Sequence, residues 1–280
     1  MEEACSRCHL KSVNKLIAKF QPSLEVSEAL QVEAKKILAE NAHLPNPYVA
    51  TYIQRLAKDK MNVASLYREE KIRANTVLLS NYEYWKNYVS ESEDPFRTAV
   101  KLAMAGNIID YGAHTAPDDI EASINELIKK DLSEDNVRQL HSDIARSSHI
   151  LYLGDNAGEI VFDKLLIETM QHPHITYVVR GQPVINDVTF ADARQTGIDQ
   201  LCKVISNGYD APSTLLEHCS PELIKAYHSA DLVISKGQGN FEGLMQAKHP
   251  TLYFLLTAKC KPIAQMLDVS EGDLVIKKQG

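Results

Sequence analysis

The stretch HILYLGDNAGEIVFDKLLIETM, residues 149–170, decides the fold of this chain. Its first part, residues 149–155, is a short apolar run that ends in a turn, which is typical of a buried strand. Its second part, residues 159–170, carries apolar residues at three- and four-residue spacing and predicts a helix. Asp155 and Asn156 stand between the two parts. The stretch therefore predicts a strand–turn–helix unit with two polar side chains at its turn.

The same alternation continues to the end of the sequence. After residue 170 we expect strands at 175–181, 202–208, 231–237, 251–258 and 272–278 and helices at 186–197, 221–230, 241–247 and 258–267. Strands that alternate with helices imply an α/β fold with a mostly parallel sheet and right-handed crossovers.

The segment before residue 149 has a different pattern, in which apolar residues recur at helical spacing. We expect helices at 12–20, 27–41, 46–59, 63–89, 96–112, 121–130 and 133–147. The sequence thus predicts a helical N-terminal domain over residues 1–145, followed by an α/β domain over residues 146–280.

Composition narrows the class of protein. The 280 residues carry a formal net charge of −7 with acidic and basic residues well mixed, which argues against a general nucleic-acid binder but allows a small anionic substrate. The five cysteines are odd in number and irregularly spaced, which favours a reducing compartment. We find neither a signal-peptide pattern nor an apolar run of the ~20 residues that a membrane helix needs. We expect a cytoplasmic protein without a membrane partner, and its oligomeric state stays open.

Polar residues gather where the predicted strands end. Ligands of open α/β sheets bind beyond the carboxyl ends of the strands, and Asp155, Asn156 and Asp187 all fall there. Carboxylate and amide oxygens are hard ligands that suit Mg²⁺ or Mn²⁺. The alternative is that these residues only cap the helices that follow them.

The segment KGQGN, residues 236–240, has the character of a phosphate-binding loop. Gly237 and Gly239 allow the backbone to approach an anion, the helix start around Asn240 offers free N–H groups, and Lys236 adds a positive charge. An ordinary glycine-rich turn is the alternative. Glu159 and Arg180 are weaker candidates, for which a structural role is at least as plausible.

Other motifs, present or absent, exclude classes of protein but do not assign a function. The segment CSRCH at residues 5–9 has the spacing of a c-type haem site, yet no export signal accompanies it, and a zinc site would need two more ligands. We expect Cys5 and Cys8 on one face of an N-terminal helix, with a redox or auxiliary metal role left open. The absence of GxSxG and GxGxxG argues against an α/β-hydrolase and a dinucleotide-binding protein.

Five segments in the same order resemble the ARMT-like damage-control phosphatase family, once known only as a domain of unknown function. They are CSRC at 5–8, AGNIIDYG at 105–112, GDNAGEIVFDKLLIE at 154–168, VRGQPVINDVTFADARQTGI at 179–198 and ISKGQGNFEGL at 234–244. The cysteine pair together with AGNIID is similar to the prokaryotic-type branch. The resemblance spans essentially the whole chain.

This resemblance implies a helical N-terminal part on a Rossmann-like three-layer α/β/α core, and a metal-dependent phosphatase acting on phosphate monoesters of small, often damaged, phosphometabolites. It implies a divalent ion (Mg, Mn, Co or Ni) held by Asp155, Asn156 and Asp187, with Lys236 meeting the phosphate and Asn107 and Asp110 closing over the site. The alternatives are a carboxyl methyltransferase, for which GDNAGE would be a poor cofactor loop, and a non-catalytic phosphometabolite-binding protein.

Overall fold

The segment after residue 149 folds as alternating strands and helices in the computed structural model, which describes residues 3–106 and 120–279. The strands are β1 Ile150–Leu153, β2 Ile175–Val179, β3 Lys203–Ser206, β4 Leu232–Lys236, β5 Leu252–Thr257 and β6 Leu274–Gln279. The helices between them are α9 Glu159–Met170, α10 Phe190–Thr196, α11 Pro221–Ser229, α12 Gly237–Leu244 and α13 Lys261–Leu267.

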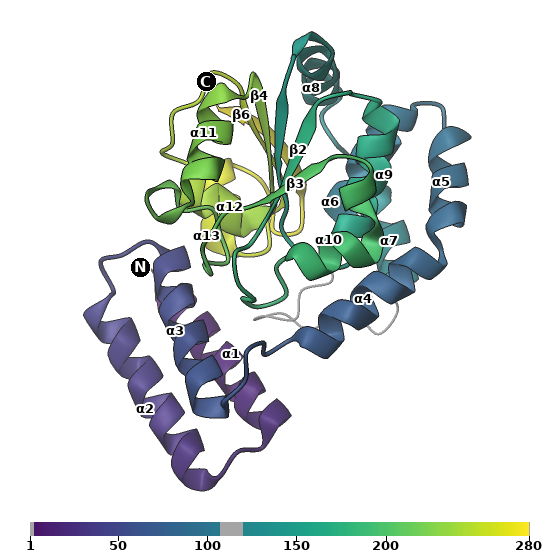
Figure 1. Cartoon of the computed structure of the whole chain (residues 1–280). Coiled ribbons are helices and arrows are strands. Elements are labelled where there is room, and N and C mark those ends of the chain that lie inside the picture. Colours follow the sequence, from purple (N-terminus) through teal and green to yellow (C-terminus); the bar gives the residue numbers. More distant parts are fainter. Residues whose placement is uncertain (1–2, 107–119, 280) are drawn as a thin grey trace.

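These strands form one sheet in the order β3-β2-β1-β4-β5-β6, in which only β6 runs antiparallel to its neighbour. Successive side chains point to opposite faces, so Ile150 and Tyr152 of β1 enter one apolar core and Leu151 and Leu153 the other. Helices cover both faces (Figure 1), which confirms the predicted three-layer α/β/α fold with a mostly parallel sheet.

The strand order reverses between β1 and β4. From β1 the chain proceeds outward to β2 and β3, and then returns to β4 and continues to β5 on the other side. The carboxyl ends of two such strands flank a crevice where open α/β sheets bind ligands. Here those ends lead into Asp155 after β1 and Gly237 after β4, so the topology alone brings the two predicted site segments together.

The N-terminal segment is helical, as predicted. Its helices are α1 Glu3–Phe20, α2 Leu24–Glu40, α3 Asn46–Met61, α4 Arg68–Ser80, α5 Tyr82–Ser90, α6 Pro95–Ala105, α7 Ile120–Ile128 and α8 Glu134–Arg146. The single helix expected at 63–89 was wrong, because the chain turns at Asn81 and resumes as α5. Asn81 donates its N–H to the last carbonyls of α4 and accepts from Trp85 N at the start of α5. The turn lets Trp85 pack edge-on against Phe162 of α9.

The N-terminal helices contribute to two different cores. Helices α1 to α3 enclose their own apolar cluster around Val13, Leu30 and Ile53, and Figure 1 shows them as a group beside the sheet's lower edge in that view. Apolar residues of the helices from α4 on join the cluster on one face of the sheet. The predicted boundary at residue 145 stays a proposal, and the packing adds that α1 to α3 have a core of their own.

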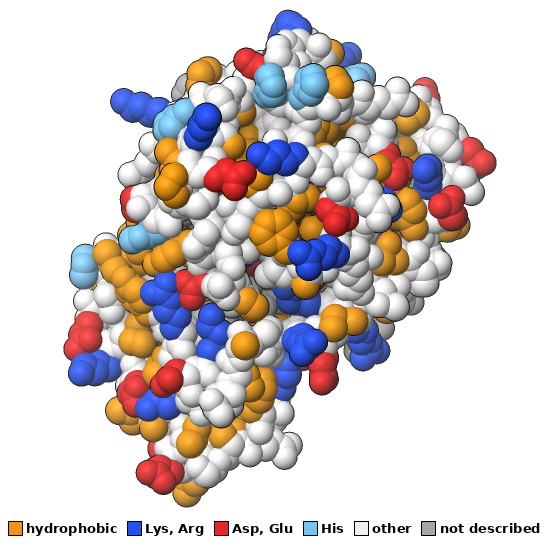
Figure 2. Space-filling model, in the orientation of Figure 1, with side chains coloured by type: hydrophobic (Ala, Val, Ile, Leu, Met, Phe, Trp, Pro, Cys, Tyr) orange, Lys and Arg blue, Asp and Glu red, His pale blue; other side chains and the backbone are white. Residues whose placement is uncertain are grey.

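The described surface is mixed in charge. Figure 2 shows acidic and basic side chains interspersed over the face that is drawn, alongside scattered apolar residues. In the described residues, no helix combines the length and apolar character needed to cross a membrane.

Candidate active site

Backbone pairing places Asp187 beside the turn that follows β1. Asn156 and Asp187 form an isolated antiparallel bridge. Val188 N donates to Asp155 O at 2.8 Å, and Ala157 N donates to Asn186 O at 2.8 Å. Two segments that are about thirty residues apart in sequence are therefore joined at the carboxyl edge of the sheet, and the predicted trio Asp155, Asn156 and Asp187 is brought together.

Arg180 lies behind this trio at the end of β2. Its Nε donates to Asp187 Oδ2 at 2.7 Å, and its Nη2 lies 3.8 Å from Asp155 Oδ1. The same guanidinium donates to Asn240 Oδ1 at 3.0 Å and to Thr214 Oγ1 at 3.3 Å. Because several partners accept hydrogen bonds from its planar guanidinium group, the buried Arg180 is held in place and fixes the orientation of Asp187.

A second buried cluster lies next to the first. Lys236 Nζ donates to Glu159 Oε1 at 2.7 Å, to Asp163 Oδ1 at 2.6 Å and to Ala103 O at 2.8 Å. Asp163 also accepts hydrogen bonds from the hydroxyls of two tyrosines, Tyr152 and Tyr177. An ammonium group has three N–H donors, so Lys236 has all of them engaged.

Electrostatics couples the two clusters. Burial raises the pKa of Glu159 to about 8, with Asp155 adding to the shift and Lys236 opposing it. Burial also raises the pKa of Asp187 to about 7, which Asp155 increases and Arg180 opposes. For Lys236, burial works against the charged form, but Asp163 and Glu159 outweigh it and raise the pKa. The carboxylates therefore repel one another across the site even in the presence of their cations.

A cavity of about 250 Å³ opens over the trio. Asp155, Asn156 and Asp187 line one side together with Gly239, whereas residues of α1 and α3 line the other. Glu159, Arg180, Lys236, Gly237 and Asn240 are not among the lining residues. The sequence-predicted residues thus divide into those that face the cavity and those that support it from behind. Asn107 and Asp110 lie outside the described residues.

Two glycines of KGQGN are required by close packing. A Cβ on Gly237, whose φ is +80°, would lie 1.8 Å from Asp155 Oδ2. A Cβ on Gly239 would lie 2.2 Å from Pro212 O. The segment is the first turn of α12, with Lys236 at its N-cap. Glycine here lets the start of a helix reach the Asp155 carboxylate.

Some polar residues of the site were not predicted. Asn75 of α4 is fully buried and accepts from Gly158 N at 2.6 Å, which anchors the turn after Asn156. Asp163 holds Lys236, and its position among the apolar residues of IVFDKLL is a signal that a buried carboxylate needs partners. Cys5 and Cys8 lie on α1, as expected, and both line the cavity.

The donor set fits a divalent cation on grounds of charge. Four buried carboxylates, Asp155, Glu159, Asp163 and Asp187, face two buried cations, Arg180 and Lys236, which leaves a net charge of −2 when all six are ionised. Buried charge without compensation is costly. Within residues 3–106 and 120–279, no group of three His, Cys, Asp or Glu side chains is arranged to hold a metal. Among these residues, Asp155 and Asp187 would hold a cation together with the amide oxygen of Asn156, which lines the same cavity.

Comparisons with known proteins identify the family of this chain. The chain is 36% identical to a damage-control phosphatase of Archaeoglobus fulgidus, over 88% of the chain and 87% of that protein. It is 34% identical to an uncharacterised protein of Methanocaldococcus jannaschii, over 98% of the chain and 94% of that protein. The crystal structure of a DUF89 family protein from Pyrococcus horikoshii superposes with a TM-score of 0.87 and 28% identity, covering 99% of this chain and 98% of the other. The family model of the damage-control phosphatase ARMT1-like domain matches residues 1–275. The chain belongs to the ARMT1-like damage-control phosphatase family.

Proposed function

We propose that this protein is a metal-dependent phosphatase that hydrolyses phosphate monoesters of small, damaged or side-product phosphometabolites. The observation that carries the proposal is the convergence of Asp155, Asn156 and Asp187 on one cavity, where buried carboxyl groups outnumber the buried cations Arg180 and Lys236. Relatives named damage-control phosphatases support the reaction class.

The trio would hold a divalent ion, drawn from Mg²⁺, Mn²⁺, Co²⁺ or Ni²⁺, by two carboxylates and one amide oxygen. When bound, such an ion supplies Lewis-acid polarisation of the phosphoryl group and an activated water. Arg180 keeps Asp187 oriented toward the cavity through its 2.7 Å bond. Gly239, at the start of α12, lines the cavity, so backbone N–H groups there are suited to a phosphoryl oxygen.

For Lys236 we propose a part other than the phosphate contact expected from the sequence. Its three N–H donors are engaged by Glu159, Asp163 and Ala103 O, and it does not line the cavity. We propose that Lys236 acts from behind the site as the counter-charge of Glu159 and Asp163. A direct phosphate contact would require the ammonium to give up one of these partners.

The test is a phosphate-release assay over a panel of phosphometabolites, with each of the four metals in turn and with a chelator. We expect metal-dependent release, and a loss of about a hundredfold or more in Asp155→Asn. Asp143→Asn, a buried carboxylate on α8 outside the cavity, is the control and should keep turnover. Full turnover of Asp155→Asn with Mn²⁺ would exclude the proposal.

Two further readouts separate the alternatives. Methyl transfer without any phosphate release would indicate a carboxyl methyltransferase. Binding of phosphate esters that a chelator does not weaken, again without release, would indicate a non-catalytic binding protein.

A further inference from the structure

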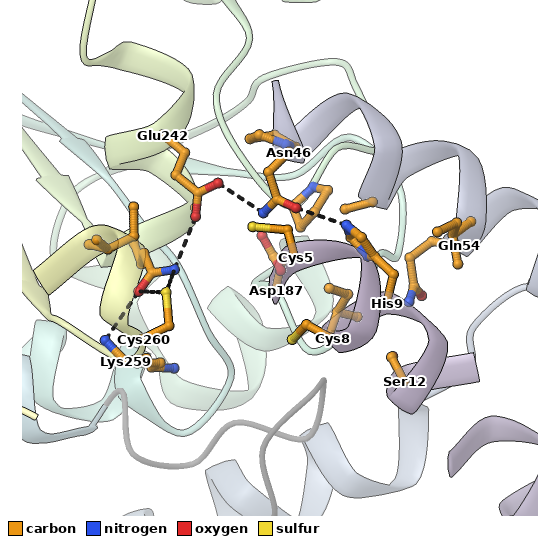
Figure 3. A pocket seen from close by; sticks show the side chains of 18 of the residues that line it. Cys5, Cys8, His9, Ser12, Asn46, Gln54, Asp187, Glu242, Lys259 and Cys260 are labelled. Carbon is orange, nitrogen blue, oxygen red and sulfur yellow. Dashed lines mark hydrogen bonds between the residues drawn. The ribbon is translucent and has the colours of Figure 1, made fainter. Parts of the chain in front are cut away.

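The side of the cavity opposite Asp155 is built by helices α1 and α3. His9 and Ser12 of α1 and Asn46 and Gln54 of α3 line it, interspersed with small and branched apolar residues. Figure 3 shows His9, Ser12 and Gln54 together on this side, with Asp187 between them and Glu242. If the phosphate of a substrate lies at the Asp155 side, the organic part of the molecule extends toward this wall.

Two polar residues of the wall, His9 and Asn46, already have hydrogen-bond partners. His9 Nε2 lies 2.8 Å from Asn46 Oδ1, and Asn46 Nδ2 donates to Glu242 Oε2 at 2.8 Å. Glu242 Oε1 in turn accepts from Gln238 Nε2 at 3.0 Å. This chain of hydrogen bonds links α1, α3 and α12 and holds the wall in place (Figure 3).

Gln54 differs from His9 and Asn46. Its side chain lines the cavity and is only 4% exposed, yet its Oε1 has no hydrogen-bond partner in the described structure. Thr51, a few residues earlier on the same helix, satisfies its hydroxyl by donating to Pro47 O at 2.7 Å. A buried amide oxygen without a partner costs roughly 1–3 kcal/mol. An amide oxygen on a cavity wall that lacks a donor can accept a hydrogen bond from a bound ligand.

We propose that Gln54 is a specificity-determining residue, whose Oε1 accepts a hydrogen bond from a hydroxyl or N–H group in the organic part of the phosphate ester. The inference rests on the proposed function for the phosphate end of the substrate. It assigns a requirement to the other end, namely that the organic part carries a hydrogen-bond donor within reach of α3. A substrate without the donor leaves the amide oxygen buried and unpaired, which is the strongest form of discrimination that a small site achieves.

The test uses matched probes, ω-hydroxyalkyl phosphates and alkyl phosphates of equal chain length, in the presence of Mn²⁺. The proteins are the wild type, Gln54→Met, which is similar in size but lacks the acceptor, and Gln54→Glu, which keeps one. Gln31→Met, a change of an exposed glutamine on α2, is the matched control. For each pair we would measure kcat/KM and, separately, the rise in Tm that each probe causes.

We expect the wild type to prefer the hydroxylated probe of the fitting length by about tenfold or more in kcat/KM, and to be stabilised more by it. Gln54→Met should bring this ratio close to one, whereas Gln54→Glu and Gln31→Met should retain it. The ligand-free Gln54→Met protein should melt at or above the wild-type Tm, because the substitution removes an unsatisfied buried group.

The Tm readout keeps this inference separate from the proposed function. If no probe releases phosphate with any metal, the proposed function fails, and the probe-induced Tm shifts still decide the role of Gln54. Equal effects of both probes at every length in the wild type would overturn the inference, since no donor of the organic part would then reach the amide oxygen. A lower Tm of Gln54→Met with an unchanged preference would equally overturn it, because it would show a purely structural glutamine.

Discussion

Gly237 packs so closely against Asp155 that a Cβ added to the glycine would lie 1.8 Å from the carboxylate Oδ2. The clash involves Asp155, a residue of the candidate metal site. The glycine also has a φ of +80°, a backbone conformation that other residues rarely adopt. We therefore predict that Gly237→Ala displaces Asp155, lowers stability by about 1–3 kcal/mol and lowers metal-dependent turnover at least tenfold. Thermal unfolding and phosphate release measure the two effects.

Gly272 supplies a matched control. It has a φ of +91°, but an added Cβ there would meet only Lys130 Nζ, the end of a flexible side chain, at 2.9 Å. Gly272→Ala should therefore carry a similar backbone strain and keep turnover. Equal losses of activity in both variants would show that strain alone, and not the contact with Asp155, explains the effect at Gly237.

Divalent cations should raise the Tm of the protein. A cation that binds the folded state stabilises the ionised carboxylates of Asp155 and Asp187, whose mutual repulsion adds to the raised pKa of Asp187, and a ligand present at 100 times its Kd adds about 2.7 kcal/mol to the stability. Asp187→Asn should lose most of the shift that Mn²⁺ causes, and Asp143→Asn should retain it. A shift of the same size in Asp187→Asn would remove this residue from the metal site.

Lys236→Met should destabilise the protein strongly. Both Lys236 and its partners Glu159 and Asp163 are fully buried, and removal of one partner from a buried ion pair costs about 3–5 kcal/mol because the other charge is left uncompensated. Chemical denaturation would measure the loss. The control is Lys203→Met, whose ion pair with Glu222 lies on the surface and should contribute less than about 1 kcal/mol. A small effect at Lys236 would argue that its ammonium is free for a ligand.

The sequence predicted which residues meet at this edge of the sheet better than it predicted how their side chains are directed. The convergence of Asp155, Asn156 and Asp187 could be predicted because the ends of parallel strands meet at one edge, and that edge follows from the alternation of strands and helices. Lys236 belongs to the same edge, but whether its side chain turns toward the cavity or toward Asp163 depends on packing with α6 and α9. No local pattern in KGQGN encodes that choice.

The unpredicted features arise from contacts between distant segments. In the sequence, Gln54 is one polar residue of an amphipathic helix, and only the position of α3 beside α1 and α12 makes it a buried residue of the cavity wall. The break at Asn81 was missed because apolar spacing continues through it, whereas the turn is fixed by the burial of Trp85 against α9. Periodicity reports which face of an element is apolar, and it does not report the partner of that face.

Asp143 should make stability depend on pH at the acid end. Its carboxylate accepts from Tyr253 Oη at 2.6 Å and from Lys278 Nζ at 2.8 Å, and it also pairs with Arg146, so it ties α8 to β5 and β6. Burial acts to raise its pKa, but Lys278, Tyr253 and Arg146 outweigh burial and lower the pKa from 3.8 to about 2. Because the folded-state pKa is the lower one, the ionised carboxylate contributes stability above pH 3.8, and this contribution is lost as the pH falls toward 2.

Asp143→Asn should accordingly lower the free energy of unfolding by about 1–3 kcal/mol at neutral pH. Its difference in stability from the wild type should shrink as the solution becomes more acidic than pH 3.8. Urea unfolding at a series of pH values measures it. Asp135→Asn on the same helix alters an ion pair on the surface and should leave the free energy of unfolding unchanged throughout, because exposed ion pairs contribute little. If the difference in free energy of unfolding between the wild type and Asp143→Asn does not depend on pH, the packing of the side chain, and not its charge, joins α8 to the edge of the sheet.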